Sequence, residues 1–140
     1  MAFQKAQNSS SEDVDEFMIE MLNSPKTLKI VEIGEFKVAQ HSREGYKFFY
    51  VTFEDVETNN KFNLSFNAKV NDDDSVYIGQ GAKLYPLLSF VSHIDDEAIV
   101  CFKEDIDEAL NGLKFKAKTR REKFGRKSYF VLVPISEVVE

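Results

Sequence analysis

The residues with the clearest chemical pattern lie between Gly112 and Pro134, where cations alternate with apolar or small side chains. Successive side chains of a strand point to opposite faces, so one face here would present a row of cations. Such a row suits the phosphates of a nucleic-acid backbone. It equally suits a solvated face that keeps a sheet edge from pairing with other chains. The cations are Lys114, Lys116, Lys118, Arg120, Arg121, Lys123, Arg126 and Lys127, set against the single acid Glu122.

Charge is distributed unevenly along the chain. The eight cations and one acid give this stretch a net charge of +7, whereas the whole chain carries −6. Residues 1–23 hold five acids and one lysine, and residues 93–111 hold seven acids and one lysine. A local positive field attracts an anion even when the net charge has the wrong sign. The acidic total therefore does not exclude a nucleic-acid ligand.

A second row of side chains suited to binding lies between Tyr46 and Val56. Phe49, Val51 and Phe53 fall on one face of the predicted strand, which leaves Tyr46, Phe48 and Tyr50 on the other. Nucleobases stack on such rings without sequence readout, at about 1–3 kcal/mol per base. Alternatively, the N-terminal helix or a subunit interface covers the rings, or they are half-buried strand residues. The sequence leaves these alternatives open.

No spacing in the chain indicates catalysis, a metal or a cofactor. His41 and His93 do not pair with a nucleophile at a known spacing. Gly79-Gln80-Gly81 lacks the lysine and the spacing of a phosphate-binding loop. The acidic run 71–75 lacks the glycine and distal glutamate of a calcium-binding loop. We expect a binding protein that is not an enzyme and needs no cofactor.

Composition predicts one mainly β domain in the cytoplasm. The chain has 140 residues, with thirteen Phe and five Tyr, residue types that favour strands. Its single cysteine, Cys101, excludes an internal disulfide and is typical of a reducing compartment. No apolar run reaches the roughly 18 residues of a membrane span, and the N-terminus lacks the apolar core of a signal peptide.

The elements that position these rows follow from the hydrophobic pattern. We expect a flexible N-terminal tail over residues 1–24, with a short amphipathic helix from Asp13 to Leu22, and a barrel over residues 25–136. Apolar stripes predict helices around Leu84–Val91 and over Lys103–Leu110, whereas the run Ala98–Phe102 is ambiguous. The expected strands are a long first strand from Thr27 bent near Gly34, then 46–56, 61–67, and two halves of a hairpin turning near Phe124-Gly125.

This element order, with the bend, the aromatic second strand and the cationic hairpin, resembles the OB-fold. More narrowly, residues 27–134 resemble the single-stranded DNA-binding OB domains of the archaeal replication-protein-A type and of phages. The resemblance implies a five-stranded OB-type barrel with a helix between strands 3 and 4 and a short N-terminal helix. The chain departs from larger members in lacking a zinc-binding cysteine cluster and in having one barrel.

The resemblance also implies a function and a site. Single-stranded DNA would cross strands two and three between loops 41–45 and 121–127, in replication, recombination or repair; RNA is a possible ligand too. The alternative is a protein-interaction barrel that binds no nucleic acid, and the acidic N-terminal segment is a candidate contact for a protein partner. The expected site residues are Arg43, Tyr46, Phe48, Tyr50, Lys61, Asn63, Lys114, Lys116, Lys118, Arg120, Arg121, Lys123, Phe124, Arg126 and Lys127.

Overall fold

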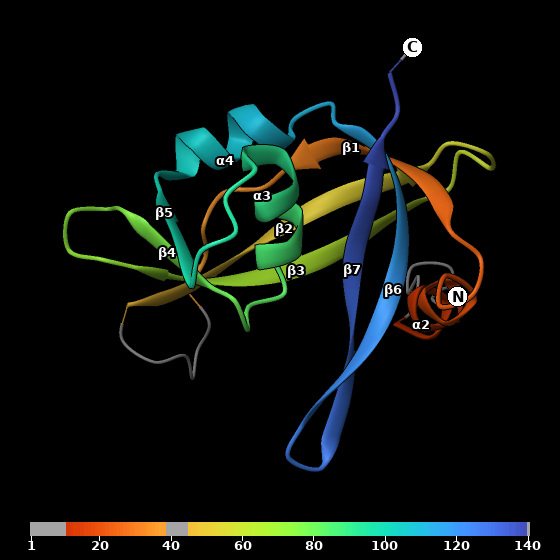
Figure 1. Ribbon diagram of the computed structural model, residues 1–140, viewed down its shortest axis with the longest axis horizontal. Coiled ribbons are helices and arrows are strands. Elements are labelled where there is room, and N and C mark those ends of the chain that lie inside the picture. Colours follow the sequence, from red (N-terminus) through yellow and green to blue (C-terminus); the bar gives the residue numbers. More distant parts are fainter. Residues whose placement is uncertain (1–10, 39–44, 140) are drawn as a thin grey trace, which may run out of the picture.

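Seven antiparallel strands form one curled sheet in the computed structural model, which describes residues 11–38 and 45–139 (Figure 1). The strand order is β5-β4-β3-β2-β1-β6-β7. No ladder among the described residues joins the outer strands β5 and β7, so the sheet is a curled half-barrel. The elements are α2 (Ser11–Glu20), β1 (Lys26–Ile33), β2 (Tyr46–Asp55), β3 (Lys61–Val70), β4 (Val76–Gly79), α3 (Tyr85–Ser92), β5 (Ala98–Cys101), α4 (Lys103–Leu110), β6 (Lys114–Phe124) and β7 (Lys127–Glu137).

The expected number of five strands is wrong, because β4 and β5 extend the sheet beyond β3. β4 pairs with the end of β3 through Val70 and Val76, and β5 pairs with β4 along its whole length. Each has only four residues, too few for a two-residue period to stand out from the surrounding sequence. Two helices, α3 and α4, lie between β3 and the basic hairpin, as the apolar stripes predict, whereas the OB-fold resemblance implied one.

The two faces of β2 are those that the sequence predicts. Phe49, Val51 and Phe53 are fully buried and belong to the central core cluster. On the opposite face Phe48 is half-buried and Tyr50 is 42% exposed. A shift of one residue in the pairing with β3 would exchange these two sets, so burial of the apolar set fixes the register.

Helix α2 packs on the inner surface of the sheet. Its Met18 and Met21 are buried, and the Thr119 hydroxyl of β6 donates a hydrogen bond of 2.6 Å to the Met18 carbonyl. The Phe17 ring lies 4.8 Å from that of Phe62 on β3. The expected helix is thus present, and it lies on the face opposite Tyr50. The part of the expected tail at residues 1–10 lies outside the described residues.

The first strand is shorter than expected, and its irregularity lies earlier than the bend predicted near Gly34. The pairing of β1 with β2 shifts register between Ile30 and Glu32, and β1 ends at Ile33. The Gly34 N–H then donates to the Tyr50 carbonyl at 2.7 Å, where an added Cβ would lie 3.2 Å from the same oxygen. Such close approach of two backbones favours glycine.

None of the helices in residues 11–38 and 45–139 is long and apolar enough to cross a membrane. Helices α3 and α4 instead pack against the core of the sheet. α3 contributes Leu87 and Leu88 to the core, and α4 contributes Ile106 and Leu110. These apolar stripes are the ones that the sequence predicts, and the bounds of α4 match the expected range.

We expect Phe49→Ala to lower the free energy of unfolding by about 3–5 kcal/mol, because it removes a buried ring and leaves a cavity. Tyr50→Ala, the neighbouring position on the exposed face, is the control and should change stability by no more than about 0.5 kcal/mol. Urea unfolding followed by circular dichroism measures both. The reverse order of effects would show that the two faces of β2 are exchanged.

Candidate nucleic-acid interface

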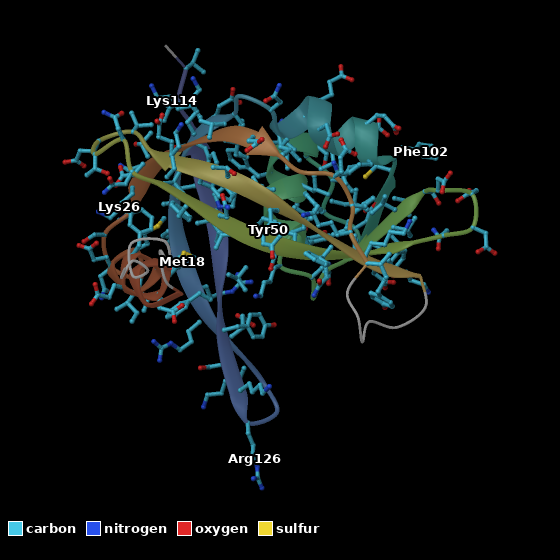
Figure 2. All side chains as sticks on the ribbon, turned by 180° about the vertical axis from the view of Figure 1, so that it is seen from behind. Met18, Lys26, Tyr50, Phe102, Lys114 and Arg126 are labelled. Carbon is cyan, nitrogen blue, oxygen red and sulfur yellow. The ribbon has the colours of Figure 1, made fainter. Side chains whose placement is uncertain are left out.

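The outer face is the surface formed by the side chains of β2 and β3 that point away from the core. Tyr50 lies opposite Ser65, and Phe48 lies opposite Asn67. The Phe48 and Tyr50 rings meet edge to face at 5.6 Å, which holds the Tyr50 ring in place. The Lys37 ammonium lies 5.8 Å from the Tyr50 ring centre. Figure 2 shows Tyr50 in the middle of this face.

A groove of about 230 Å³ continues the outer face beyond β3. One wall is formed by Ser65 and Asn67, the cross-strand partners of Tyr50 and Phe48. The other wall carries Lys83 and Tyr129, whose ammonium and ring centre lie 5.3 Å apart. Because Tyr129 belongs to β7, this groove links the outer face with the basic hairpin.

The basic hairpin projects from the sheet as a twisted two-stranded arm (Figures 1 and 2). Phe124 pairs with Lys127, so the turn consists of Gly125 and Arg126 alone, and Gly125 has a φ of 64°. Glycine with positive φ at the first turn position is typical of a type II′ hairpin. The turn predicted near Phe124-Gly125 is confirmed, and Arg126 lies at the tip of the arm (Figure 2).

The alternation predicted for β6 is present. Phe115, Ala117 and Thr119 are buried, and Lys116, Lys118 and Arg120, which alternate with them, are exposed. Arg120 pairs with Glu122 at 2.7 Å, and the Arg121 guanidinium lies 4.9 Å from the Phe130 ring centre. Within the described ranges no acid lies at salt-bridge distance from the exposed cations Lys116, Lys118, Lys123, Arg126 and Lys127.

The structure gathers only some of the residues expected at the site. Lys114 and Lys116 lie opposite Lys29 and Thr27 of β1, so β1 separates them from Tyr50 on β2. Of the other expected residues, Lys61 and Asn63 on β3 are exposed, and Asn63 accepts a hydrogen bond of 2.7 Å from the Thr52 hydroxyl. Tyr46 is half-buried and lies opposite Lys69. Phe124 is the last residue of β6, and Arg43 lies outside the described residues.

Sequence reasoning missed Lys37, Lys83 and Tyr129. Lys83 stands in a short segment before α3, and Tyr129 stands in the returning strand of the hairpin. Only the long-range contact between these two segments reveals that they line one groove. The one local indication of this site was that Tyr129 is an aromatic residue close to a basic turn. An aromatic residue at that position could equally belong to the core.

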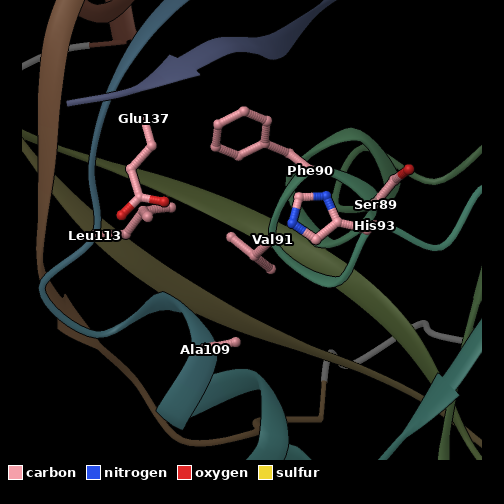
Figure 3. A pocket seen from close by; sticks show the side chains of 7 residues that line it. All are labelled: Ser89, Phe90, Val91, His93, Ala109, Leu113 and Glu137. Atoms are coloured by element: carbon pink, nitrogen blue, oxygen red, sulfur yellow. The ribbon is translucent and has the colours of Figure 1, made fainter. Parts of the chain in front are cut away.

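A larger cavity of about 560 Å³ lies between α3, α4 and the end of β7. Phe90, Val91 and Leu113 give it apolar walls, and His93 and Glu137 stand on different sides of it (Figure 3). Ser89 donates its hydroxyl to the Ile94 carbonyl at 2.7 Å, a bond that closes the end of α3. We interpret this cavity as a gap between helices. Among its lining residues no nucleophile is hydrogen-bonded to a base, as covalent catalysis would require.

Two side chains away from the outer face have shifted pKa values. Burial raises the pKa of the Cys101 thiol, and the nearby Asp105 charge raises it further, so the thiol stays protonated at neutral pH. The Ser75 hydroxyl donates to Asp73 at 2.5 Å and the Ser75 N–H at 3.0 Å, which lowers the pKa of that carboxyl. Asp73 is therefore ionised at neutral pH.

Comparison of the chain with models of protein families, with curated proteins and with solved structures finds no match. Among the residues whose structure is described, no three His, Cys, Asp or Glu side chains cluster in a way that would hold a metal ion. The geometry of the outer face, the groove and the arm is therefore the basis for assigning a function.

If phosphates bind in the groove, Lys83→Ala should weaken binding of oligo-dT. The slope of log binding constant against log salt concentration should become less steep by about 0.7, because one phosphate contact is lost. Lys26→Ala is the matched control, since Lys26 lies beside Glu20 of α2, at 3.8 Å, away from the groove. Fluorescence anisotropy at several salt concentrations measures both. Equal salt-dependence slopes for Lys83→Ala and Lys26→Ala would show that the phosphates do not bind in the groove.

Proposed function

We propose that this protein binds single-stranded DNA with little sequence preference, in replication, recombination or repair. One observation carries the proposal. The exposed ring of Tyr50 lies on a face that runs through a groove, lined by Lys83 and Tyr129, toward an arm of exposed cations. Rings beside a cationic groove are the common requirement of single-strand binding, because bases stack on the rings while cations neutralise phosphates.

The proposed path of the strand crosses β2 and β3. A base stacks on the ring of Tyr50, which meets Phe48 edge to face and has the Lys37 ammonium over it. The backbone then passes Ser65 and Asn67, whose exposed polar side chains suit sugar and phosphate oxygens. Lys83 and Tyr129 offer the next cation and ring, and the arm supplies further positive charge.

The connectivity supports a variant of the OB-type barrel. β1, β2 and β3 form a meander, β6 pairs with β1, and β7 pairs with β6, which is the order of the five strands of that fold. The β4–β5 pair and the two helices are inserted between the third and fourth of these strands. Oligonucleotides bind OB-folds across strands two and three, where Tyr50 lies.

We expect oligo-dT to bind at low salt and to weaken as salt rises, with a log–log slope of about −0.7 per neutralised phosphate. Anisotropy of a labelled dT oligomer at two salt concentrations is the decisive experiment. An oligo-U of the same length shows whether RNA is bound as well, since stacking serves both. No binding at low salt would refute the proposal and favour the protein-interaction barrel.

We expect Tyr50→Ala to cost about 1–3 kcal/mol of binding free energy to oligo-dT, the loss of one stacked base. Tyr77→Ala is the matched control, because Tyr77 is 44% exposed, compared with 42% for Tyr50, but lies on β4. Titration combined with thermal unfolding separates binding from folding. Should both variants bind like the wild type, the strand does not cross the outer face at Tyr50.

A further inference from the structure

The far end of the sheet exposes apolar side chains that the proposed path does not use. Tyr77 on β4 is 44% exposed, and Val100, directly opposite on β5, is 61% exposed. Phe102, just after β5, is 46% exposed. We refer to these three residues as the apolar end. In Figure 2 Phe102 lies far from Arg126 at the tip of the arm.

Acids are concentrated in the segments next to β4 and β5 in the sequence, whereas on the β3 side the exposed Lys69 lies directly opposite Tyr77. The acids stand in the loop before β4, in the segment before β5 and in helix α4. The one lysine of α4, Lys103, is paired with Asp107 at 2.6 Å. Phosphates would be repelled here, so the apolar end is unsuited to continuing the DNA path. The acidic rim consists of Asp72, Asp73, Asp74, Asp95, Asp96, Glu97, Glu104, Asp105, Asp107 and Glu108.

The two outer strands of the sheet differ in their protection against pairing. β7 carries Pro134 opposite the register shift at Lys116 and Ala117, and proline and bulges oppose the addition of another strand. β5 reads Ala-Ile-Val-Cys and has neither a charge nor a proline. Each outer strand has one ladder partner in the described sheet, so the lack of charge and proline on β5 makes it the edge better suited to accept a further strand.

We propose that the β5 edge binds an extended cationic segment of a protein partner by strand addition. Apolar side chains of the segment would cover Val100 and Tyr77, while its lysines or arginines meet the acidic rim. A second copy of this chain is the poorer occupant, because antiparallel pairing of two β5 edges would bring two acidic rims together. Strand addition gives affinity through the main chain and specificity through alternate side chains.

This inference goes beyond DNA binding and does not depend on it. The apolar end uses β4 and β5, whereas the proposed DNA path uses β2, β3, the groove and the arm. A partner bound to the β5 edge would thus leave Tyr50 and the groove accessible. The two activities can therefore be measured separately on the same protein.

The test uses the full chain and a labelled eight-residue peptide in which lysine and valine alternate. The wild type should bind it, and Val100→Lys should weaken binding at least tenfold by removing an apolar contact and adding a like charge. Val139→Lys is the matched control, since Val139 is 81% exposed outside the sheet. Binding of oligo-dT should be unchanged in both variants. Tyr77→Lys provides the same readout if Val100→Lys does not fold.

Three results would overturn the proposal. Equal peptide affinity of the wild type and the folded Val100→Lys or Tyr77→Lys variant would show that the apolar end is not the site. If the wild type bound a peptide of four lysines followed by four valines as tightly as the alternating peptide, binding would come from general charge attraction and not from strand addition. Self-association of the wild type that Val100→Lys abolishes would identify a second copy of the chain as the occupant.

Discussion

Burial of Phe49, Val51 and Phe53 is the constraint on which the rest of the structure depends. These side chains are fully enclosed, and large core residues contribute several kcal/mol each, about 3–5 for a phenylalanine. The register of β2 against β3 follows from them, since a slip of one residue would expose all three. The position of Tyr50 on the outer face is therefore set by its neighbours and not by its own contacts.

Separation of charge is the second feature that shapes function. The tip of the arm, which carries cations, lies far in space from Phe102 just after β5, whose flanking segments are acidic (Figure 2), in a chain with a net charge of −6. At physiological salt, fields are screened over about 8 Å, so each end acts on its own ligand. An anionic polymer is attracted to the arm and groove, while the β5 end repels it and suits a cationic ligand.

The sequence predicted features that local patterns control. The faces of β2 and β6, the helix Lys103–Leu110 and the turn at Gly125 all follow from periodicity or from turn chemistry within a few residues. The outward position of Tyr50 could be predicted in the same way, because a strand exposes every second side chain.

Features that depend on contacts between distant segments were not predictable. The groove forms where Lys83, before α3, meets Tyr129 of β7, and no local pattern encodes that meeting. β4 and β5 have only four residues each, and from the sequence the segment of β5 was an apolar run of ambiguous type. The basic row of β6 was identified correctly as an outward face, but its first cations lie across β1 from Tyr50. Only the sheet order could reveal that separation.

Amide chemical shifts recorded during a titration with oligo-dT test the central claim most directly. We expect the largest changes on Tyr50, Ser65, Asn67, Lys83 and Tyr129, with further changes along the arm. β5 and α4 should be unaffected at the same ratios of DNA to protein. Changes confined to β5, α4 or the inner surface at α2, or no changes at low salt, would contradict it.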